Sequence, residues 1–244
     1  MRITDVQRGT NVTEIADGLF RVSTPVPPEV VPGGLTFNQF LLVDDAPLLF
    51  HTGLRRFFPS TLDAVRSVLP PERLRWIGFS HVEADECGAL NNWLAVAPDA
   101  QPLCSRLAAL VSVSDIADRP PHGLADGQTV QLGRRTVRWI DAPHLPHAME
   151  CGYLHDETDG NLLCGDLFAQ LGTTVSPLTE SSAAIWEPSE AARQVFRYAP
   201  LRDPGGIVDR LARLEPRLLA CMHGTSYRGD GGALLRQLRD ALTA

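Results

Sequence analysis

Three potential metal ligands stand at alternate positions directly after an apolar run: His81, Glu83 and Asp85. In an extended chain, alternate side chains point to the same side. One imidazole and two carboxylates would therefore converge on one point, with Glu86 beside them. Nitrogen and oxygen donors gathered in this way are typical of sites for transition metals. The segment around His81 thus predicts a metal site.

Further candidate ligands follow three other apolar segments, each of which predicts a strand. They are His144 and His147 after 137–140, Asp166 after 162–164, and His223 after 218–221. Because strand ends are rigid, side chains there can be held at coordination distance. The four strand ends together predict one site built from distant parts of the chain.

Strands and helices alternate in the first half of the chain. Apolar runs and turn residues predict strands over 12–23 (with a hairpin turn at Asp17-Gly18), 37–43, 47–51, 74–79 and 102–105. Apolar residues at helical spacing predict helices over 59–69, 87–97 and 106–113.

The second half repeats this plan. Strands are predicted over 129–132, 135–140, 152–155, 161–164 and 217–221, and helices over 188–198, 207–214 and 232–242. The Ser/Thr-rich stretch 172–185 is long enough to predict a functional loop. Strand-rich blocks followed by helices predict an α+β protein, with two sheets packed together and helices outside. Without a linker sequence, we expect a single domain over residues 1–244.

Composition excludes several classes of protein. The formal charge of −7 argues against a nucleic-acid surface, which needs a basic face. No apolar run approaches the roughly 20 residues of a membrane helix, and the N-terminus lacks the apolar core of a signal peptide. The five cysteines include no Cys-x-x-Cys spacing, so we interpret them as reduced thiols of a cytoplasmic protein.

The combined motifs resemble the metallo-β-lactamase superfamily, whose usual first motif is His-x-His-x-Asp-His. The variant found here, His81-x-Glu83-x-Asp85-Glu86, is similar to that of the diiron branch, the flavodiiron proteins and related oxygen-binding diiron proteins. Other segments similar to that branch are 37–43, 144–149, 165–170 and 222–224, so that the resemblance covers about residues 12–240. It implies an αββα sandwich with a dinuclear metal site at one edge of the sheets.

The resemblance also implies roles for individual residues. His81, Glu83 and His144 would bind one iron ion, Asp85 and His223 would bind the other, and Asp166 would bridge the two. His144 and His147 are alternative ligands; the His-x-Pro match favours His144, and His147 would then support the ligands. Since carboxylates are abundant in this set, iron or manganese is favoured over zinc, although zinc remains an alternative.

Two positions depart from the family pattern. Glu86 replaces the histidine that usually ends the first motif; it could ligate the second metal, hold a water molecule or cap the following helix. His51 stands where the superfamily usually has an aspartate that supports the ligands, and a histidine there could still donate or accept a supporting hydrogen bond.

Three functions are compatible with these residues. The leading hypothesis is a non-haem diiron protein that binds or reduces O2 or NO. The alternatives are a metal-dependent hydrolase of a thioester, lactone or phosphodiester, and a non-enzymatic oxygen sensor. We see no flavodoxin segment to bind FMN, so we expect a separate electron-donor or signalling protein; a homodimer is also compatible with the sequence.

Overall fold

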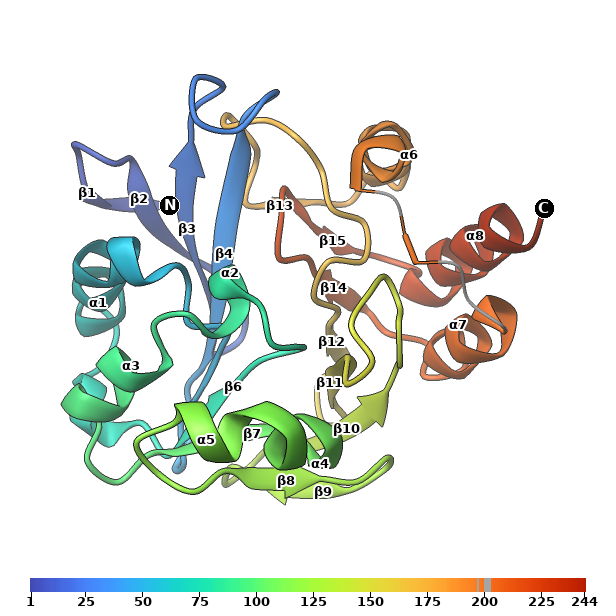
Figure 1. The fold of residues 1–244 in the computed structure, drawn as a ribbon. Coiled ribbons are helices and arrows are strands. Elements are labelled where there is room, and N and C mark those ends of the chain that lie inside the picture. Colours follow the sequence, from blue (N-terminus) through green and yellow to red (C-terminus); the bar gives the residue numbers. More distant parts are fainter. Residues whose placement is uncertain (197, 200–202) are drawn as a thin grey trace.

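The computed structural model describes residues 1–196, 198–199 and 203–244. Two β-sheets pack face to face, and helices cover the outer face of each sheet (Figure 1). The predicted α+β sandwich is therefore confirmed. None of the helices in the described residues is long and apolar enough to cross a membrane.

The first sheet contains the N-terminal strands in sequence order. They are β1 (Arg2–Asp5), β2 (Thr10–Ala16), β3 (Leu19–Val26), β4 (Leu35–Leu42), β5 (Leu48–Phe50), β6 (Trp76–Gly78), β7 (Gln101–Ser105) and β8 (His122–Leu124). Strands β1 to β5 pair antiparallel, whereas β5 to β8 pair parallel. The parallel strands β5 and β6 end at the same edge of the sheet.

The second sheet is formed by the later strands. Its order is β13 (Leu178–Thr179), β15 (Ser226–Arg228), β14 (Leu218–Ala220), β12 (Asn161–Leu163), β11 (Gly152–Asp156), β10 (Thr136–Asp141) and β9 (Thr129–Gln131). Because β12 and β14 are parallel neighbours, the segments that follow them leave the sheet side by side. These segments carry Asp166 and His223.

Helical segments fill the two outer layers. Those outside the first sheet are η1 (Arg55–Phe57), α1 (Phe58–Arg66), η2 (Pro71–Arg73), α2 (Ala84–Cys87), α3 (Leu90–Val96), α4 (Arg106–Ala108), η3 (Ala109–Val113) and α5 (Ser114–Ile116). Those outside the second are α6 (Ala183–Phe196), α7 (Pro204–Ala212) and α8 (Gly231–Thr243).

Three predicted helices differ from the observed ones. The helix predicted over 87–97 is two helices, α2 and α3, which are separated at Gly88 and Ala89. The helix predicted over 106–113 is a run of three short segments, α4, η3 and α5, that ends at Ile116. The helix predicted over 188–198 begins earlier, at Ala183, and Pro188 lies inside it; residue 197 of that prediction lies outside the described residues. The stretch predicted as a loop over 172–185 thus contains a short strand, β13, and the start of α6.

The hydrophobic core has three layers that follow the αββα order. Large side chains such as Phe40, Trp139 and Leu154 are buried between the sheets. Trp93 packs with the helices outside the first sheet, and Leu235 packs with those outside the second. This packing holds the two sheets rigidly, so the strand ends that carry the candidate ligands keep their relative positions.

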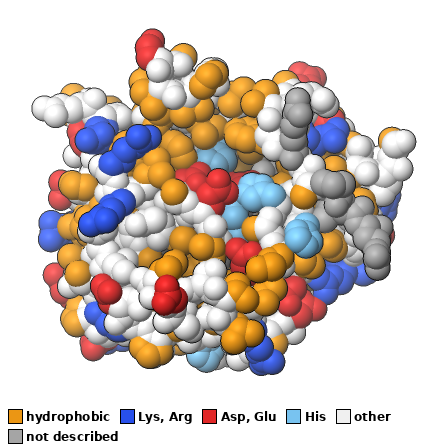
Figure 2. Space-filling view, viewed as in Figure 1, with side chains coloured by type: hydrophobic (Ala, Val, Ile, Leu, Met, Phe, Trp, Pro, Cys, Tyr) orange, Lys and Arg blue, Asp and Glu red, His pale blue; other side chains and the backbone are white. Residues whose placement is uncertain are grey.

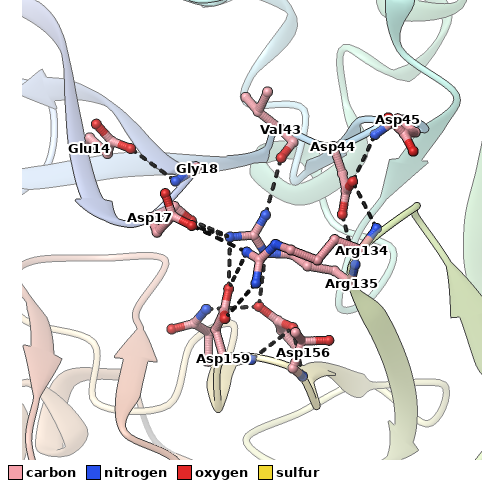
Figure 3. A network of polar contacts seen from close by, with 12 residues as sticks. Glu14, Asp17, Gly18, Val43, Asp44, Asp45, Arg134, Arg135, Asp156 and Asp159 are labelled. Atoms are coloured by element: carbon pink, nitrogen blue, oxygen red, sulfur yellow. Dashed lines mark hydrogen bonds and ion pairs between the residues drawn. The ribbon is translucent and has the colours of Figure 1, made fainter.

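A cluster of charged residues ties the two sheets together at the strand ends opposite the candidate ligands (Figure 3). Arg135, from the turn between β9 and β10, is buried and its Nε donates to Asp156 Oδ2 at 3.3 Å. Its Nη1 also donates at 3.2 Å to the backbone oxygen of Val43, the residue that follows β4 of the first sheet. Arg134, more exposed, makes two hydrogen bonds to the carboxylate of Asp159. We call these residues the inter-sheet clamp.

Candidate metal centre

Polar side chains from both sheets meet at one edge of the sandwich. His81 follows β6, Asp166 follows β12, His223 follows β14, and His147 lies in the connection between β10 and β11. Histidine and acidic side chains accordingly gather near the middle of one face of the molecule (Figure 2). The predicted convergence of distant strand ends is what the structure shows.

The first group of donors contains His81, Glu83, His147 and Asp166. The Nε2 atom of His147 lies 2.9 Å from Nε2 of His81 and 2.9 Å from Oε2 of Glu83. The same Glu83 oxygen is 3.0 Å from Nε2 of His81. Oδ2 of Asp166 lies 3.7 Å from His81 Nε2 and 3.6 Å from His147 Nε2. The four side chains therefore point their donor atoms at one small volume.

The second group contains Asp85, Glu86 and His223. Nε2 of His223 lies 3.4 Å from Oδ2 of Asp85 and 3.4 Å from Oδ1 of Asp166. Asp166 thus turns one carboxylate oxygen to each group. This arrangement fits a carboxylate shared between two metal ions, which is the role expected for Asp166 from the sequence.

The sequence predicts that alternate side chains of an extended segment, from His81 to Asp85, point to the same side. In the structure the backbone is extended at Glu83 but not at Asp85. Helix α2 begins at Ala84, so Asp85 and Glu86 lie in its first turn and not on an extended strand. The turn of the helix directs both carboxylates to the second group, whereas Glu83, at the extended residue before the helix, joins the first. Glu86 is therefore buried beside Asp85 and His223 and does not lie at a solvent-exposed helix end.

His147, and not His144, enters the cluster. The sequence-based choice of His144 as a ligand is not supported, because its side chain is exposed and it belongs to neither donor group. The loop is anchored by Leu145, which is fully buried and whose backbone oxygen accepts hydrogen bonds from Tyr153 Oη and Cys151 Sγ. This anchor leaves His144 on the solvent side and directs His147 inward.

A pair of alanine variants distinguishes these two histidines. Replacing His147 with alanine is expected to lower metal affinity by more than the roughly 10–100-fold that follows loss of a supporting residue. Replacing His144 with alanine is expected to leave metal content unchanged. Metal analysis of the two proteins after dialysis against a weak chelator measures the difference. Equal losses in both variants would contradict the assignment.

Behind His81 lies a line of hydrogen bonds that fixes its orientation. Ser80 Oγ is 3.0 Å from Nδ1 of His81 and 3.1 Å from Nε2 of His51. His51 is fully buried and has a left-handed backbone conformation (φ 66°). Burial lowers the pKa of His51 to about 3, so it is neutral at physiological pH. Ser80 was not recognised in the sequence, although its place directly before His81 was a usable signal.

His223 is held by the first sheet. Its Nδ1 donates to the backbone oxygen of Thr36 at 2.8 Å, which leaves Nε2 facing the carboxylates. The loop that carries His223 is fixed from the same side: Asn38 Nδ2 donates to the backbone oxygens of Cys221 and Gly224, and Arg21 Nη2 also donates to Gly224. The Asn-containing strand that was singled out in the sequence thus positions a candidate ligand.

Contacts within the cluster determine its charges. Hydrogen bonds from His147 and His81 lower the pKa of Glu83 to about 2. Burial acts to raise the pKa of Asp166, but its contact with His223 outweighs burial and holds that pKa well below the usual range. Burial acts to lower the pKa of His223, yet Asp166 and Asp85 raise it to about 10. Without a metal, His223 is therefore a cation beside two carboxylates.

Glu86 tests whether these residues fit a metal. Both of its carboxylate oxygens are buried, and neither has a hydrogen-bond partner among the described residues. Burial, together with the charges of Asp166 and Asp85, raises the pKa of Glu86 well above its usual range. An unpaired buried carboxyl group is costly unless a cation or hydrogen bonds compensate it. A divalent ion would be the missing partner of the Glu86 carboxylate and would displace the proton that its raised pKa retains. The donor set therefore fits a pair of metal ions.

A cavity of about 240 Å³ opens above the two donor groups. Its polar floor contains Glu83, Asp85, His147, Asp166 and His223. Its walls are apolar, with Leu35, Phe37, Leu54, Ala169 and Phe196. The ring of Phe196 stacks on that of His223 at a centroid distance of 6.2 Å. The cavity thus offers a small, largely apolar space directly over the candidate ligands.

Comparison with known proteins identifies related sequences. A family model described as ODP family beta lactamase matches residues 35–224. The chain is 27% identical over 213 residues to a nitric oxide reductase from Moorella thermoacetica, which covers 83% of this chain and 52% of that protein. It is 25% identical over 209 residues to the rubredoxin-oxygen oxidoreductase of Megalodesulfovibrio gigas, covering 81% and 50%. The chain thus spans about half the length of these relatives.

A solved structure shows the same fold. The rubredoxin oxygen:oxidoreductase from the anaerobe Desulfovibrio gigas superposes with a TM-score of 0.83 at 19% sequence identity. The match covers 96% of this chain and 62% of that chain. At this level of identity the likeness establishes the fold alone, an αββα sandwich.

Proposed function

Because the chain belongs to the ODP family of β-lactamase-like domains, we propose that it is a non-haem diiron protein that binds or reduces O2 or NO. The observation that carries this proposal is the pair of donor groups that share Asp166 beneath a small apolar cavity. Two of the relatives are named for reactions of nitric oxide and oxygen, which agrees with the proposal.

We propose a ligand set for each metal ion from the two donor groups. His81, Glu83 and His147 would hold one ion, and Asp85, Glu86 and His223 would hold the other, with Asp166 between them. Two bound ferrous ions would each supply one electron to a diatomic ligand. The abundance of carboxylates in this set favours iron or manganese over zinc.

The residues around the ligands prepare the site for that reaction. Ser80 and Thr36 hold the rings of His81 and His223 through their Nδ1 atoms, which leaves both Nε2 atoms free to coordinate. Phe37 and Phe196 line the cavity and give it an apolar surface next to the donor groups.

The size of the cavity favours a diatomic ligand over a larger substrate. At about 240 Å³ the cavity is smaller than the roughly 300–1,000 Å³ of sites for organic ligands. A long-chain thioester would extend beyond this cavity, whereas O2 or NO would fit inside it. The neighbouring cavity of about 680 Å³ touches Glu83 alone among the donors, so it gives little support to the hydrolase alternative.

The proposed reaction needs an external source of electrons. We propose that a separate redox protein supplies them, as the name of the rubredoxin-oxygen oxidoreductase indicates for that relative. We also place the protein in the cytoplasm, since its five cysteines are all unpaired and buried.

Metal analysis of protein purified without added metal tests the proposal. We expect about two iron ions per chain, because two groups of donors are present. After anaerobic reduction, addition of O2 or NO should be followed by consumption of the gas and by visible absorption of the oxidised iron pair. An optical spectrum and a gas electrode record both signals.

Other outcomes would redirect the assignment. A colourless zinc protein that hydrolyses thioesters or lactones, with turnover lost in Asp85→Ala, would replace the proposal by the hydrolase alternative. Reversible O2 binding without consumption would favour the oxygen sensor.

A further inference from the structure

Three exposed arginine side chains, Arg8, Arg55 and Arg56, lie beside the metal face; we call them the arginine patch. Arg55 and Arg56 belong to η1, and Arg8 lies in the turn between β1 and β2. Arg55 also lines the cavity of about 680 Å³ that Glu83 borders. Figure 2 shows basic side chains gathered on this side of the histidine and acidic cluster.

The arginine patch holds three positive charges that no acidic side chain among the described residues pairs with. The guanidinium carbons of Arg8 and Arg56 lie 5.5 Å and 4.9 Å from the centroid of the same ring, that of Phe57. Among the described residues, none of the three guanidinium groups forms an ion pair. The nearby Asp5 accepts from the backbone N–H of Arg8 and from Ser60 Oγ instead. The patch is therefore a local concentration of positive charge open to a partner.

Its charge contrasts with that of the rest of the protein. The formal charge of the whole chain is −7. Two bound divalent ions would neutralise the four carboxylates of the donor groups. The metal-loaded site would therefore contribute little to the electrostatic potential at the neighbouring surface. All the basic residues are arginines, whose planar guanidinium groups pair well with carboxylates. An acidic surface is thus the complement of the patch.

An aromatic path leads from the patch to a candidate ligand. The ring of Phe57 is buried beneath Arg8 and Arg56 and lies 5.9 Å from that of Phe37. Phe37 in turn meets the ring of His223 edge-on at 5.4 Å. The two rings of Phe57 and Phe37 thus separate the patch from the second donor group.

We propose that the arginine patch is the docking site of an acidic protein that carries one electron at a time. This inference rests on the proposed function, because it supplies the electrons that O2 or NO reduction consumes. In each encounter the carrier loses one electron and one ion of the metal pair gains it, with no bond made or broken. Weak, charge-steered docking suits a carrier that must leave after each transfer.

Charge reversal tests the docking site. The iron-loaded triple variant Arg8→Glu/Arg55→Glu/Arg56→Glu should be reduced by an acidic rubredoxin roughly 10-fold or more slowly than the wild type at low salt. The wild-type rate should fall with rising ionic strength, and the variant rate should not. The matched control, Arg73→Glu/Arg106→Glu/Arg217→Glu, changes the net charge equally at exposed arginines outside the patch and should retain most of the wild-type rate.

Two further measurements separate the possible failures. A small uncharged hydroquinone should reduce the wild type and the patch variant at equal rates; failure to reduce even the wild type would instead count against the proposed function. Phe57→Leu should slow electron transfer from rubredoxin while keeping its salt dependence, with folding checked by thermal melting. Docking at the patch is overturned if rubredoxin reduces the patch variant as fast as the wild type. It is also overturned if the patch variant loses no more of the wild-type rate than the control variant does.

Discussion

Replacing Asp166 with alanine is expected to remove both metal ions, rather than one, and with them the reaction with O2 or NO. Its two carboxylate oxygens face different donor groups: Oδ2 lies 3.6 Å from His147 Nε2, and Oδ1 lies 3.4 Å from His223 Nε2. Without this carboxylate each group loses a donor, and two dications would face each other without a shared anion between them. Metal content should fall from about two ions per chain to well below one.

The measurement is metal analysis combined with circular dichroism, so that loss of metal can be separated from loss of fold. Asp166→Asn, which keeps one oxygen and nearly the same volume, should retain more metal than the alanine variant. Asp118→Ala is the control, because this exposed aspartate lies in neither donor group. Retention of one full equivalent of metal by Asp166→Ala would show that the two groups bind independently.

Replacing Arg135 with alanine is expected to destabilise the protein by about 3–5 kcal/mol, the usual cost of removing one partner from a buried ion pair. The Arg135 side chain is only 2% exposed and that of Asp156 is fully buried. The truncation leaves the Asp156 carboxylate with hydrogen bonds from Asn161 Nδ2 and from the backbone N–H groups of Thr158 and Asp159, but without its buried cation. It also removes the hydrogen bond that crosses to Val43 in the other sheet.

Urea unfolding of the two proteins measures this difference. Arg134→Ala is the matched control from the same inter-sheet clamp: its side chain is 49% exposed, so its pairs with Asp159 and Asp17 should contribute no more than about 1 kcal/mol. Because the clamp lies at the strand ends opposite the donors, folded Arg135→Ala protein should still bind metal. Equal midpoints for the two variants would contradict the assigned role of Arg135.

Much of the fold could be predicted because local patterns specify local structure. The turn at Asp17-Gly18 separates β2 from β3, and the apolar runs at 161–164 and 217–221 contain β12 and β14. The boundaries of α2 and α6 were missed, since packing against the sheets overrides weak helix signals near Gly88 and Pro188.

Choices within loops could not be made from local pattern. His144 and His147 are the same residue type in the same loop, so the sequence alone does not show which of them faces the cluster. The burial of Leu145 between them fixes the loop so that His147 does. Likewise, the role of Glu86 depended on whether its carboxylate would be exposed at a helix end or buried beside Asp166.

The sequence by itself determined which residue types are available to the proposed site: histidines and carboxylates that follow predicted strands, a donor set that favours iron in the proposal. Tertiary structure alone decided how those donors are divided into two groups and what surrounds them. The line from His51 through Ser80, and the path from Arg8 through Phe57, join residues far apart in the chain. Such contacts depend on how two sheets and their loops pack in space, which residue type and spacing along the chain do not specify.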